Sequence, residues 1–297
     1  MVNDTQPDLS VVVVNYNTSE YLERCLKSVR SQTGATHETV VVDNASRDGS
    51  VDMVRRHFPW AAVIANDDNA GFARANNQAL DLCRGRHIYY LNPDTEVGEG
   101  NFAAMTAFMD ADGEIGLAGC RLVNPDGSPQ SSVERRYPGQ KYAPGELDGL
   151  KGSIAWVMGA AMIARSGLVK SLGGFDERFF IYGEDADLCL RIRKAGWRIG
   201  YAADALVVHW GGRSERDNEP LEVWSRKFAA EMLFHRTHYS EKALRAIKRA
   251  HLAKAAWRIF TIRLMLPFVR EKAGARSKLD RYRHVIKALS AEVGANP

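Results

Sequence analysis

The chain has 297 residues, of which 45% are hydrophobic and 26% are charged, and its formal net charge is +4. This composition supports a sizeable buried core and excludes a largely disordered chain. Neither a secretory signal nor an apolar run of about 18 residues is visible, so we expect a cytoplasmic protein without a membrane-spanning helix.

Strands and helices are predicted to alternate over the first hundred residues. Residues 9–14 form a run dominated by four consecutive valines, which is typical of a strand buried on both faces. Thr18 or Ser19 can cap the helix that follows, which runs to about Gln32. The alternation predicts an α/β fold, with a Rossmann-like, mostly parallel sheet flanked by helices. The later elements predicted here are strands over residues 39–42, 61–65 and 88–91 and helices around 51–54 and over 72–83.

The pattern changes after residue 101. A helix over residues 102–109 and a strand over 116–122 precede residues 124–150, which hold eight Pro or Gly residues. A stretch so rich in helix and strand breakers predicts a long loop, functional or mobile. The remaining prediction is a strand over residues 153–164, helices over 165–172 and 185–194, and a last strand over 205–208.

Asp43 stands where a predicted strand ends. It directly follows three valines, so a buried strand fixes its backbone while its side chain reaches the crevice beyond the sheet. Open α/β sheets bind ligands at this carboxyl edge. A carboxylate there can accept a hydrogen bond from the imide N–H of uracil or thymine. The alternative is a helix cap or a turn, which the sequence Asp-Asn-Ala-Ser also favours.

A dense polar segment, residues 66–77, joins a predicted strand to a helix. Gly71 permits close backbone approach, and the N-terminus of the helix favours an anion. Arg74, one turn into the helix, can face a phosphate. The alternative is a capped helix whose arginine is solvated.

Asp94 is the candidate metal ligand, because it follows the predicted strand over residues 88–91 in the sequence Asn-Pro-Asp. Mg²⁺ and Mn²⁺ often take one or two carboxylates and complete their coordination with phosphate oxygens and water. His209 can ligate the same metal or touch a phosphate, and Arg213 can touch a phosphate. A turn at Asp94 and a packing role for His209 are the alternatives.

Glu184 and Asp185 begin a predicted helix directly after the apolar residues 179–182. Such surroundings can desolvate a carboxylate and raise its pKa enough for it to act as a base. Asp185 would then take the proton from an acceptor hydroxyl as that oxygen attacks the anomeric carbon of a sugar. The alternative is that the acids only complement the helix dipole.

Five motifs follow one another along the chain. They are VVVNYN at 12–17, VDNAS at 42–46, NAGFARANN at 69–77, LNPD at 91–94 and YGEDAD at 182–187. Together they resemble the family 2 inverting glycosyltransferases with the GT-A fold, over about residues 9–235. The wording of the third and fourth motifs is similar to the bacterial branch that includes rhamnosyltransferases.

This resemblance implies a nucleotide-diphosphate-sugar donor, a divalent metal and a single displacement with inversion. It implies that Asp43 contacts the nucleobase and that Asp94 binds the metal. It also implies that Asp185 is the general base, with Glu184 beside it. The family's Asp-x-Asp signature is reduced to one carboxylate, so His209 or Asp187 would contribute more to the metal. The residues assigned to the nucleotide sugar are Asn15, Asn17, Asp43, Asn44, Asn69, Gly71, Arg74, Asn92 and Arg213.

The C-terminal part of the chain differs in charge from the rest. Residues 236–297 hold 15 Lys or Arg against 4 Asp or Glu, whereas the preceding 235 residues hold 25 against 32. We therefore expect a GT-A domain over residues 1–235 and a basic amphipathic helical extension over 236–297, which Pro267 ends or kinks. Apolar and basic residues over 243–270 favour peripheral contact with an anionic membrane. The alternative is that these helices pack on the catalytic domain or on a second copy of the chain, as in a homodimer. The excess of acidic residues in the first 235 residues argues against nucleic-acid binding.

The predicted function is therefore metal-dependent, inverting transfer of a sugar to a glycan or glycolipid acceptor. The donor we favour is dTDP-L-rhamnose, then a UDP-hexose, and the acceptor is a lipid-linked bacterial surface glycan at the inner face of the plasma membrane. A nucleotidyltransferase would need a Gly-rich basic loop where residues 15–19 stand, and a dehydrogenase would need Gly-x-Gly-x-x-Gly. A non-catalytic carbohydrate-binding protein is the third alternative.

Overall fold

The computed structural model describes residues 6–213, 218–270 and 272–291. The chain divides into two compact units, which are described separately. The sheet unit comprises the described residues up to Tyr137 and those from Leu150 to Arg213, and the helical unit comprises residues 138–149 and those after 217. The expected domain boundary after residue 235 falls inside a helix of the second unit, Pro220–His238.

The main sheet of the sheet unit has the strand order β3-β2-β1-β4-β9-β6-β10-β5. Strands β1, β2, β3, β4, β6 and β10 run parallel to one another, whereas β9 and β5 are antiparallel to their neighbours. The predicted mostly parallel sheet is confirmed. The strands are β1 Leu9–Asn15, β2 His37–Asp43, β3 Ala62–Ala65, β4 His87–Leu91, β5 Thr95–Val97, β6 Ile115–Val123, β9 Ala161–Arg165 and β10 Arg198–His209.

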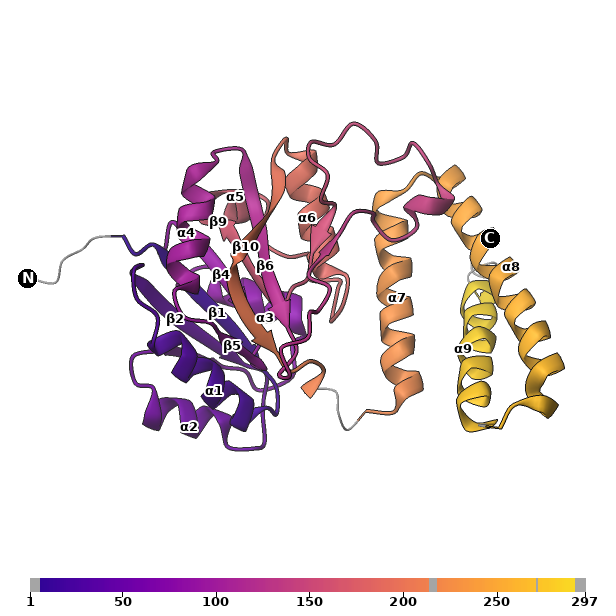
Figure 1. Ribbon diagram of the computed structural model, residues 1–297, viewed down its shortest axis with the longest axis horizontal. Coiled ribbons are helices and arrows are strands. Elements are labelled where there is room, and N and C mark those ends of the chain that lie inside the picture. The colour runs from indigo at the N-terminus through magenta and orange to yellow at the C-terminus, as the bar shows by residue number, and fades with distance from the viewer. Residues whose placement is uncertain (1–5, 214–217, 271, 292–297) are drawn as a thin grey trace, which may run out of the picture. The chain divides into compact units, whose positions relative to one another are not determined.

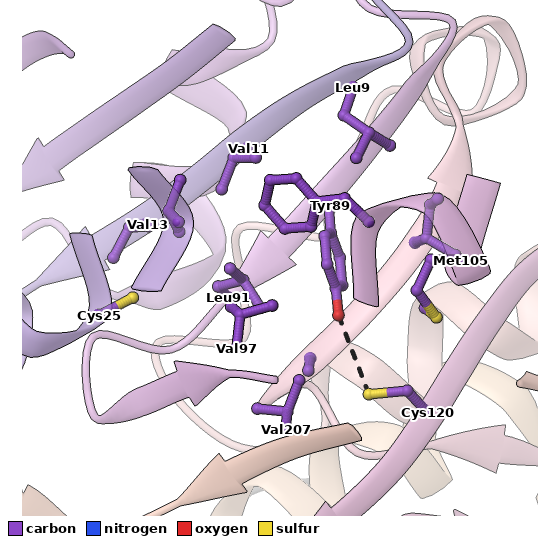
Figure 2. Packing of buried hydrophobic residues seen from close by; sticks show 14 of the residues in the cluster. Leu9, Val11, Val13, Cys25, Tyr89, Leu91, Val97, Met105, Cys120 and Val207 are labelled. Carbon is purple, nitrogen blue, oxygen red and sulfur yellow. Dashed lines mark hydrogen bonds between the residues drawn. The ribbon is translucent and has the colours of Figure 1, made fainter. Parts of the chain in front are cut away.

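Helices cover both faces of this sheet (Figure 1), because the buried side chains of its strands alternate between two cores. In β1, Val11 and Val13 join the core shown in Figure 2, whereas Val12 and Val14 join the opposite core. The first core includes residues of α1, α2 and α4, and the second includes residues of α3, α5 and α6. The helices are α1 Ser19–Arg30, α2 Ser50–His57, α3 Phe72–Ala79, α4 Asn101–Ala111, α5 Ser166–Ser171 and α6 Glu184–Lys194.

The prediction of one strand over residues 153–164 is wrong. Residues Trp156–Val157 form β8, which pairs with β7, Val133–Glu134, in a separate two-stranded sheet. Residues 158–160 are not part of a strand, and the chain then enters the main sheet as β9. Both halves are apolar because both are buried, so hydrophobicity alone does not reveal the break between them.

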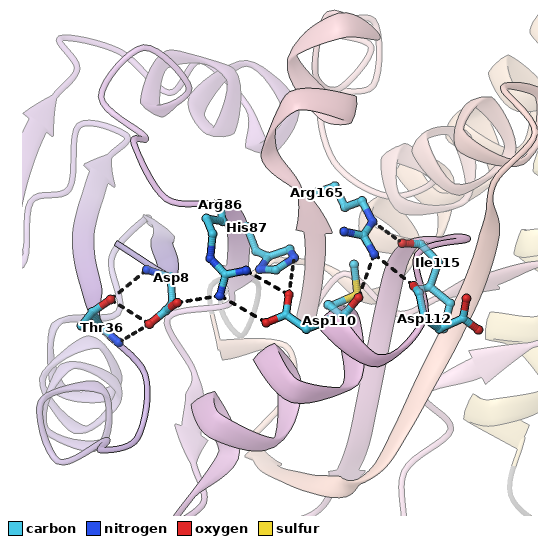
Figure 3. A network of polar contacts seen from close by, with 9 residues as sticks. Asp8, Thr36, Arg86, His87, Asp110, Asp112, Ile115 and Arg165 are labelled. Carbon is cyan, nitrogen blue, oxygen red and sulfur yellow. Dashed lines mark hydrogen bonds and ion pairs between the residues drawn. The ribbon is translucent and has the colours of Figure 1, made fainter. Parts of the chain in front are cut away.

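A polar network ties the N-terminal segment to the sheet unit at the edge where β4 begins (Figure 3). The guanidinium group of Arg86 donates to Asp8 at 2.6 Å and to Asp110 at 3.0 Å, and Asp8 also accepts from the backbone of Thr36. Arg165 adds hydrogen bonds to carbonyl groups of α4, of the turn after it and of the start of β6. These acceptors are the carbonyl oxygens of Met109, Asp112 and Ile115.

The helical unit consists of α7 Pro220–His238, α8 Glu241–Met265, the short η3 Leu266–Phe268 and α9 Lys272–Ala291, with η1 Gln140–Tyr142. The expected end of a helix at Pro267 is confirmed, since α8 stops at Met265. No helix in the described ranges is both long enough and apolar enough to cross a bilayer. The core of the unit contains Phe228, Met232, Leu244, Ala255, Val285 and Leu289.

Candidate active site

The parallel strands bring the polar residues of the motifs to one edge of the sheet. Asn15 and Asp43 end β1 and β2 and lie opposite each other in the register. Asn92 follows β4, and His209 ends β10. Because all four strands run in the same direction, their carboxyl ends share the edge at which α/β folds bind ligands.

Asp43 is held rigidly at this edge. It is 2% exposed, and its carboxylate accepts hydrogen bonds from the side-chain amide of Asn15 at 2.7 Å and from the backbone N–H of Ser46 at 2.8 Å. The hydroxyl of Thr18 donates to the carbonyl oxygen of the Asn15 amide at 2.6 Å. Thr18 is the cap residue of α1, but its side chain orients Asn15 instead of accepting a bond from the helix, contrary to the expected capping.

The loops after β1 and β3 are shaped by asparagine side chains. Asn17 adopts a positive φ of 53°, and its side-chain oxygen accepts from the backbone of Arg47. Asn69 accepts from the N–H of Gly71 at 3.0 Å, and Asn44 donates to the carbonyl of Gly71 at 3.3 Å. The backbone N–H of Asn44 donates to the carbonyl of Asn15 at 2.9 Å, which joins these contacts to the end of β1.

Gly71 is required by a contact within the chain. Its φ is +84°, and a Cβ built on it would lie 2.7 Å from the ring and 2.8 Å from the carbonyl oxygen of Phe180. That carbonyl accepts the N–H of Phe72 at 2.7 Å, so the loop before α6 is joined to the start of α3. The close approach expected at Gly71 thus involves Phe180. Arg74, in the first turn of α3, is exposed.

The two residues predicted to bind a metal lie side by side. Nε2 of His209 is 3.5 Å from Oδ1 of Asp94, and both side chains are largely buried. The backbone N–H of Trp210 donates to the carbonyl of Asp94 at 2.9 Å, and that of Arg213 contacts its carboxylate at 3.4 Å. The turn after β10 is therefore fastened to the loop after β4.

Gln130 orients His209 and was missed in the sequence, where it lies in the breaker-rich stretch over 124–150. Its side-chain oxygen is 2.9 Å from Nδ1 of His209, and its nitrogen donates to the His209 carbonyl at 2.7 Å. If Nδ1 carries the proton that this contact accepts, Nε2 keeps its lone pair on the side of Asp94. A glutamine in a loop carries no sequence signal for such a role.

The donor set at Asp94 fits Mg²⁺ or Mn²⁺ that shares its coordination with a ligand. An oxygen and an imidazole nitrogen are both acceptable to Mn²⁺, and such ions commonly leave positions for phosphate and water. Within the described ranges, no cluster of three or more His, Cys, Asp or Glu side chains is placed to hold a metal ion. Asp187, considered above as a further ligand, is fully buried and accepts from Arg191 at 2.8 Å.

Asp185 lies at the same edge through its contact with residue 159. Its carboxylate accepts from the N–H of Gly159 at 3.0 Å and from that of Ala186 at 2.7 Å. The next residue, Ala160, accepts the N–H of Asn92 at 2.9 Å. The break between β8 and β9 therefore connects Asp185 with the segment that carries Asp94. Burial raises the pKa of Asp185 to about 6, despite the two amide donors.

Glu184 is more deeply buried than its neighbour. It is 6% exposed, and one of its carboxylate oxygens has no hydrogen-bond partner. Burial, followed by the charge of Asp185, raises the pKa of Glu184 well above its ordinary value. Both acids at the start of α6 therefore have raised pKa values, and burial is the main cause for each.

Two guanidinium groups and two aromatic rings stand beside the Asp94 loop. The guanidinium carbon of Arg213 is 5.1 Å from the ring centre of Tyr21, and that of Arg24 is 5.1 Å from the ring centre of Trp210. The Trp210 ring N–H donates to Glu96 at 3.0 Å. These contacts hold cations near the sheet edge. Tyr21 and Arg24, on α1, were not predicted.

A mostly parallel sheet covered by helices on both faces, with polar side chains gathered at its carboxyl edge, is the architecture of α/β proteins that bind ligands beyond the strand ends. The glycosyl transferase family 2 model matches residues 10–171, more than half of the chain. The chain belongs to glycosyl transferase family 2 and carries a glycosyltransferase domain, which confirms the resemblance seen in its motifs.

Related proteins agree with this assignment. The chain is 27% identical over 232 residues to the N-acetylglucosaminyl-diphospho-decaprenol L-rhamnosyltransferase of Mycobacterium tuberculosis, with 68% of this chain and 75% of the relative covered. It is 26% identical to the O-antigen biosynthesis protein RfbC of Myxococcus xanthus, over 71% of this chain and 18% of that protein.

Solved structures share the fold. The mannosyltransferase PcManGT of Pyrobaculum calidifontis, in complex with GDP-Man and Mn²⁺, has a TM-score of 0.60 at 19% identity and covers 97% of this chain and 87% of its own. TarS 1–349 of S. aureus has a TM-score of 0.53 at 20% identity, with 96% of this chain and 92% of its own covered. At these identities the likeness establishes the GT-A fold.

Proposed function

We propose that this protein transfers L-rhamnose from dTDP-L-rhamnose to a hydroxyl group of a growing, lipid-linked bacterial surface glycan, with inversion at the anomeric carbon. The observation that carries the proposal is the meeting of Asp94, His209 and Asp185 at one sheet edge, through the contacts of residues 92 and 159–160. The rhamnosyl donor is favoured by the relative from Mycobacterium tuberculosis.

The nucleotide is assigned to the loops after β1, β2 and β3. The Asp43 carboxylate, fixed by Asn15 and Ser46, still has acceptor capacity for the imide N–H of thymine or uracil. Asn17, Asn44, Asn69 and Gly71 shape the surrounding backbone. Arg74 and Arg213 supply cations for the diphosphate.

Asp94 and His209 are assigned to a divalent cation, Mg²⁺ or Mn²⁺. Their donor atoms fit such an ion, and structural relatives were solved with Mn²⁺. When bound, the cation would neutralise charge that develops on the departing diphosphate. Asn92 and the backbone contacts of Trp210 hold the Asp94 loop in place for this role.

Asp185 is assigned as the general base. Its carboxylate takes the proton of the acceptor hydroxyl while the acceptor oxygen bonds to the anomeric carbon and the bond from that carbon to the diphosphate oxygen breaks. A pKa of about 6 keeps Asp185 mostly ionised at neutral pH and still basic enough to receive a proton. Glu184 is assigned to the same site as its buried neighbour, whose pKa is also raised.

A panel of nucleotide sugars tests this function. Release of nucleoside diphosphate is measured with each donor, with a lipid-linked acceptor, and with Mn²⁺ or a chelator present. We expect the highest rate with dTDP-L-rhamnose and a loss of activity on chelation. Metal-independent turnover would remove the assigned metal role, whereas preference for another sugar would change only the donor. Binding without turnover of any donor would favour a carbohydrate-binding protein.

A further inference from the structure

We propose that the C-terminal half of α8 and the turn after it dock on the surface of an anionic lipid bilayer. The contact is made by an exposed set of apolar side chains, called here the docking stripe. It consists of Trp257, Phe260, Leu264, Met265 and Phe268, which are 63%, 59%, 60%, 54% and 78% exposed. This inference goes beyond sugar transfer and does not depend on the donor or on the reaction.

The docking stripe is unusual for the surface of a folded chain. Ten large hydrophobic side chains are exposed in the described residues, and five of them lie within this segment of twelve residues. Single exposed apolar residues are ordinary, but a contiguous group of aromatic and aliphatic side chains marks an interaction surface. The rings of Trp257 and Phe260 are neighbours, with centroids 6.0 Å apart.

The stripe is distinct from the face by which α8 holds the helical unit together. Leu244, Ile247 and Ala255 are buried, and Leu244 and Ala255 pack in the core with residues of α7 and α9. One face of the helix therefore packs in the core, while Trp257, Phe260 and Leu264 follow a second helical face whose side chains are exposed. Their exposure means that more than half of each of these three side chains is free to contact another surface.

A shallow apolar groove adjoins the stripe. Ala256, Ile259, Phe260, Arg263 and Leu264 of α8 line it together with Ile286 of α9, and these two helices lie side by side (Figure 1). A groove of this composition fits an acyl chain, and the guanidinium group of Arg263 suits a lipid phosphate.

Charge decides between a bilayer and a second copy of the chain as the occupant. Residues 241–270 hold eight Lys or Arg and only one acidic residue, Glu241. By helical spacing, Lys254 and Arg258 lie on one side of the stripe and Arg263 on the other, and all three are exposed. Two copies joined through this surface would bring like charges together, whereas anionic headgroups attract them. Aromatic residues flanked by cations are typical of helices that lie in a membrane interface.

Vesicle flotation of the whole protein tests this surface without any donor or acceptor. The probes are phosphatidylcholine vesicles and vesicles in which about one lipid in four is phosphatidylglycerol. We expect binding to the anionic vesicles that weakens with added salt, and much weaker binding to phosphatidylcholine alone. The Trp257→Ala/Phe260→Ala/Phe268→Ala variant should bind at least about tenfold more weakly. Arg258→Glu/Arg263→Glu should have a similar effect.

The matched control is Trp60→Ala/Leu82→Ala, which removes exposed apolar side chains from the sheet unit and should bind like the wild type. Circular dichroism checks that each variant is folded. Failure of the wild type to bind anionic vesicles would overturn the proposal, and so would equal binding by the triple alanine variant. A wild-type dimer in light scattering that the triple variant splits, without vesicle binding, would assign the stripe to a second copy instead.

Discussion

Gln130 holds His209 at two points, the ring nitrogen Nδ1 at 2.9 Å and the backbone carbonyl at 2.7 Å. The first contact fixes the plane of the imidazole, and the second fixes the end of β10. Nε2 is thereby left 3.5 Å from the Asp94 carboxylate. A glutamine outside the five motifs thus sets the geometry of the residues assigned to the cation.

We predict that Gln130→Leu weakens the binding of Mn²⁺ in the presence of dTDP by about 10- to 100-fold, the usual effect of losing a partner that orients a metal ligand. Leucine fills the space but cannot accept from the imidazole. Titration calorimetry with Mn²⁺ measures this effect without turnover. Gln130→Glu retains an acceptor for Nδ1–H and should recover most of the affinity. An equal loss of Mn²⁺ affinity in both variants would show that the hydrogen bond to Nδ1 of His209 does not determine the affinity.

Gly71→Ala should destabilise the fold more than Gly49→Ala, by about 2 kcal/mol. Both glycines have positive φ, +84° and +81°, so alanine strains the backbone at each. Only at Gly71 does the added Cβ meet Phe180, whereas nothing lies within 4 Å at Gly49. Urea unfolding measures the difference. Equal unfolding free energies would contradict the packing of the loop before α6 on α3.

The pH dependence of transfer should follow the ionisation of Asp185. Its pKa is raised to about 6, so the protonated form, which cannot accept a proton, predominates below that pH. We expect kcat/KM to fall about tenfold for each pH unit below 6 and to level off above 7. Initial rates at saturating cation, over the range in which circular dichroism is constant, provide the profile. A profile without an acidic limb would exclude Asp185 as the base.

Asp8→Asn should lower the free energy of unfolding at pH 7 by about 1 kcal/mol, a value that allows for screening because Arg86 is 40% exposed. Hydrogen bonds from Arg86 and then Thr36 lower the pKa of Asp8 from 3.8 to about 2. The stabilisation is therefore complete above pH 3.8 and is lost as pH falls towards 2. Urea unfolding should show that the unfolding free energies of the wild type and Asp8→Asn differ less at pH 3 than at pH 7. Asp81→Asn, at an exposed position, is the control.

The order of the parallel elements could be predicted from the sequence because buried strands leave local signals. The valines before Asp43 and the run over residues 9–14 predict strands without knowledge of their neighbours. Strand β5, Thr95–Val97, was not predicted because three residues carry too little pattern. The break between β8 and β9 was also missed, since its cause is the pairing of each half with a distant segment.

The candidate site divides in the same way. Acids at a strand end or shortly after it, such as Asp43 and Asp94, could be placed from the sequence because the strand end determines their position. Gln130 and the Tyr21–Trp210 ring contact could not, because their partners are distant in sequence. The positive φ at Gly71 could be predicted from the residue type. Its contact with Phe180 could not, because the two residues are distant in sequence.

The role of Asp185 as the general base is tested most directly by comparing Asp185→Asn with the wild type. Two quantities are measured, the transfer of sugar from dTDP-L-rhamnose and the binding of dTDP with Mn²⁺. Asparagine keeps the size of the side chain and an acceptor for the N–H of Gly159 but cannot take a proton. We predict turnover lower by about two to four decades, with dTDP affinity within about twofold of the wild type. Turnover equal to that of the wild type, with the same dTDP affinity, would show that Asp185 is not the general base.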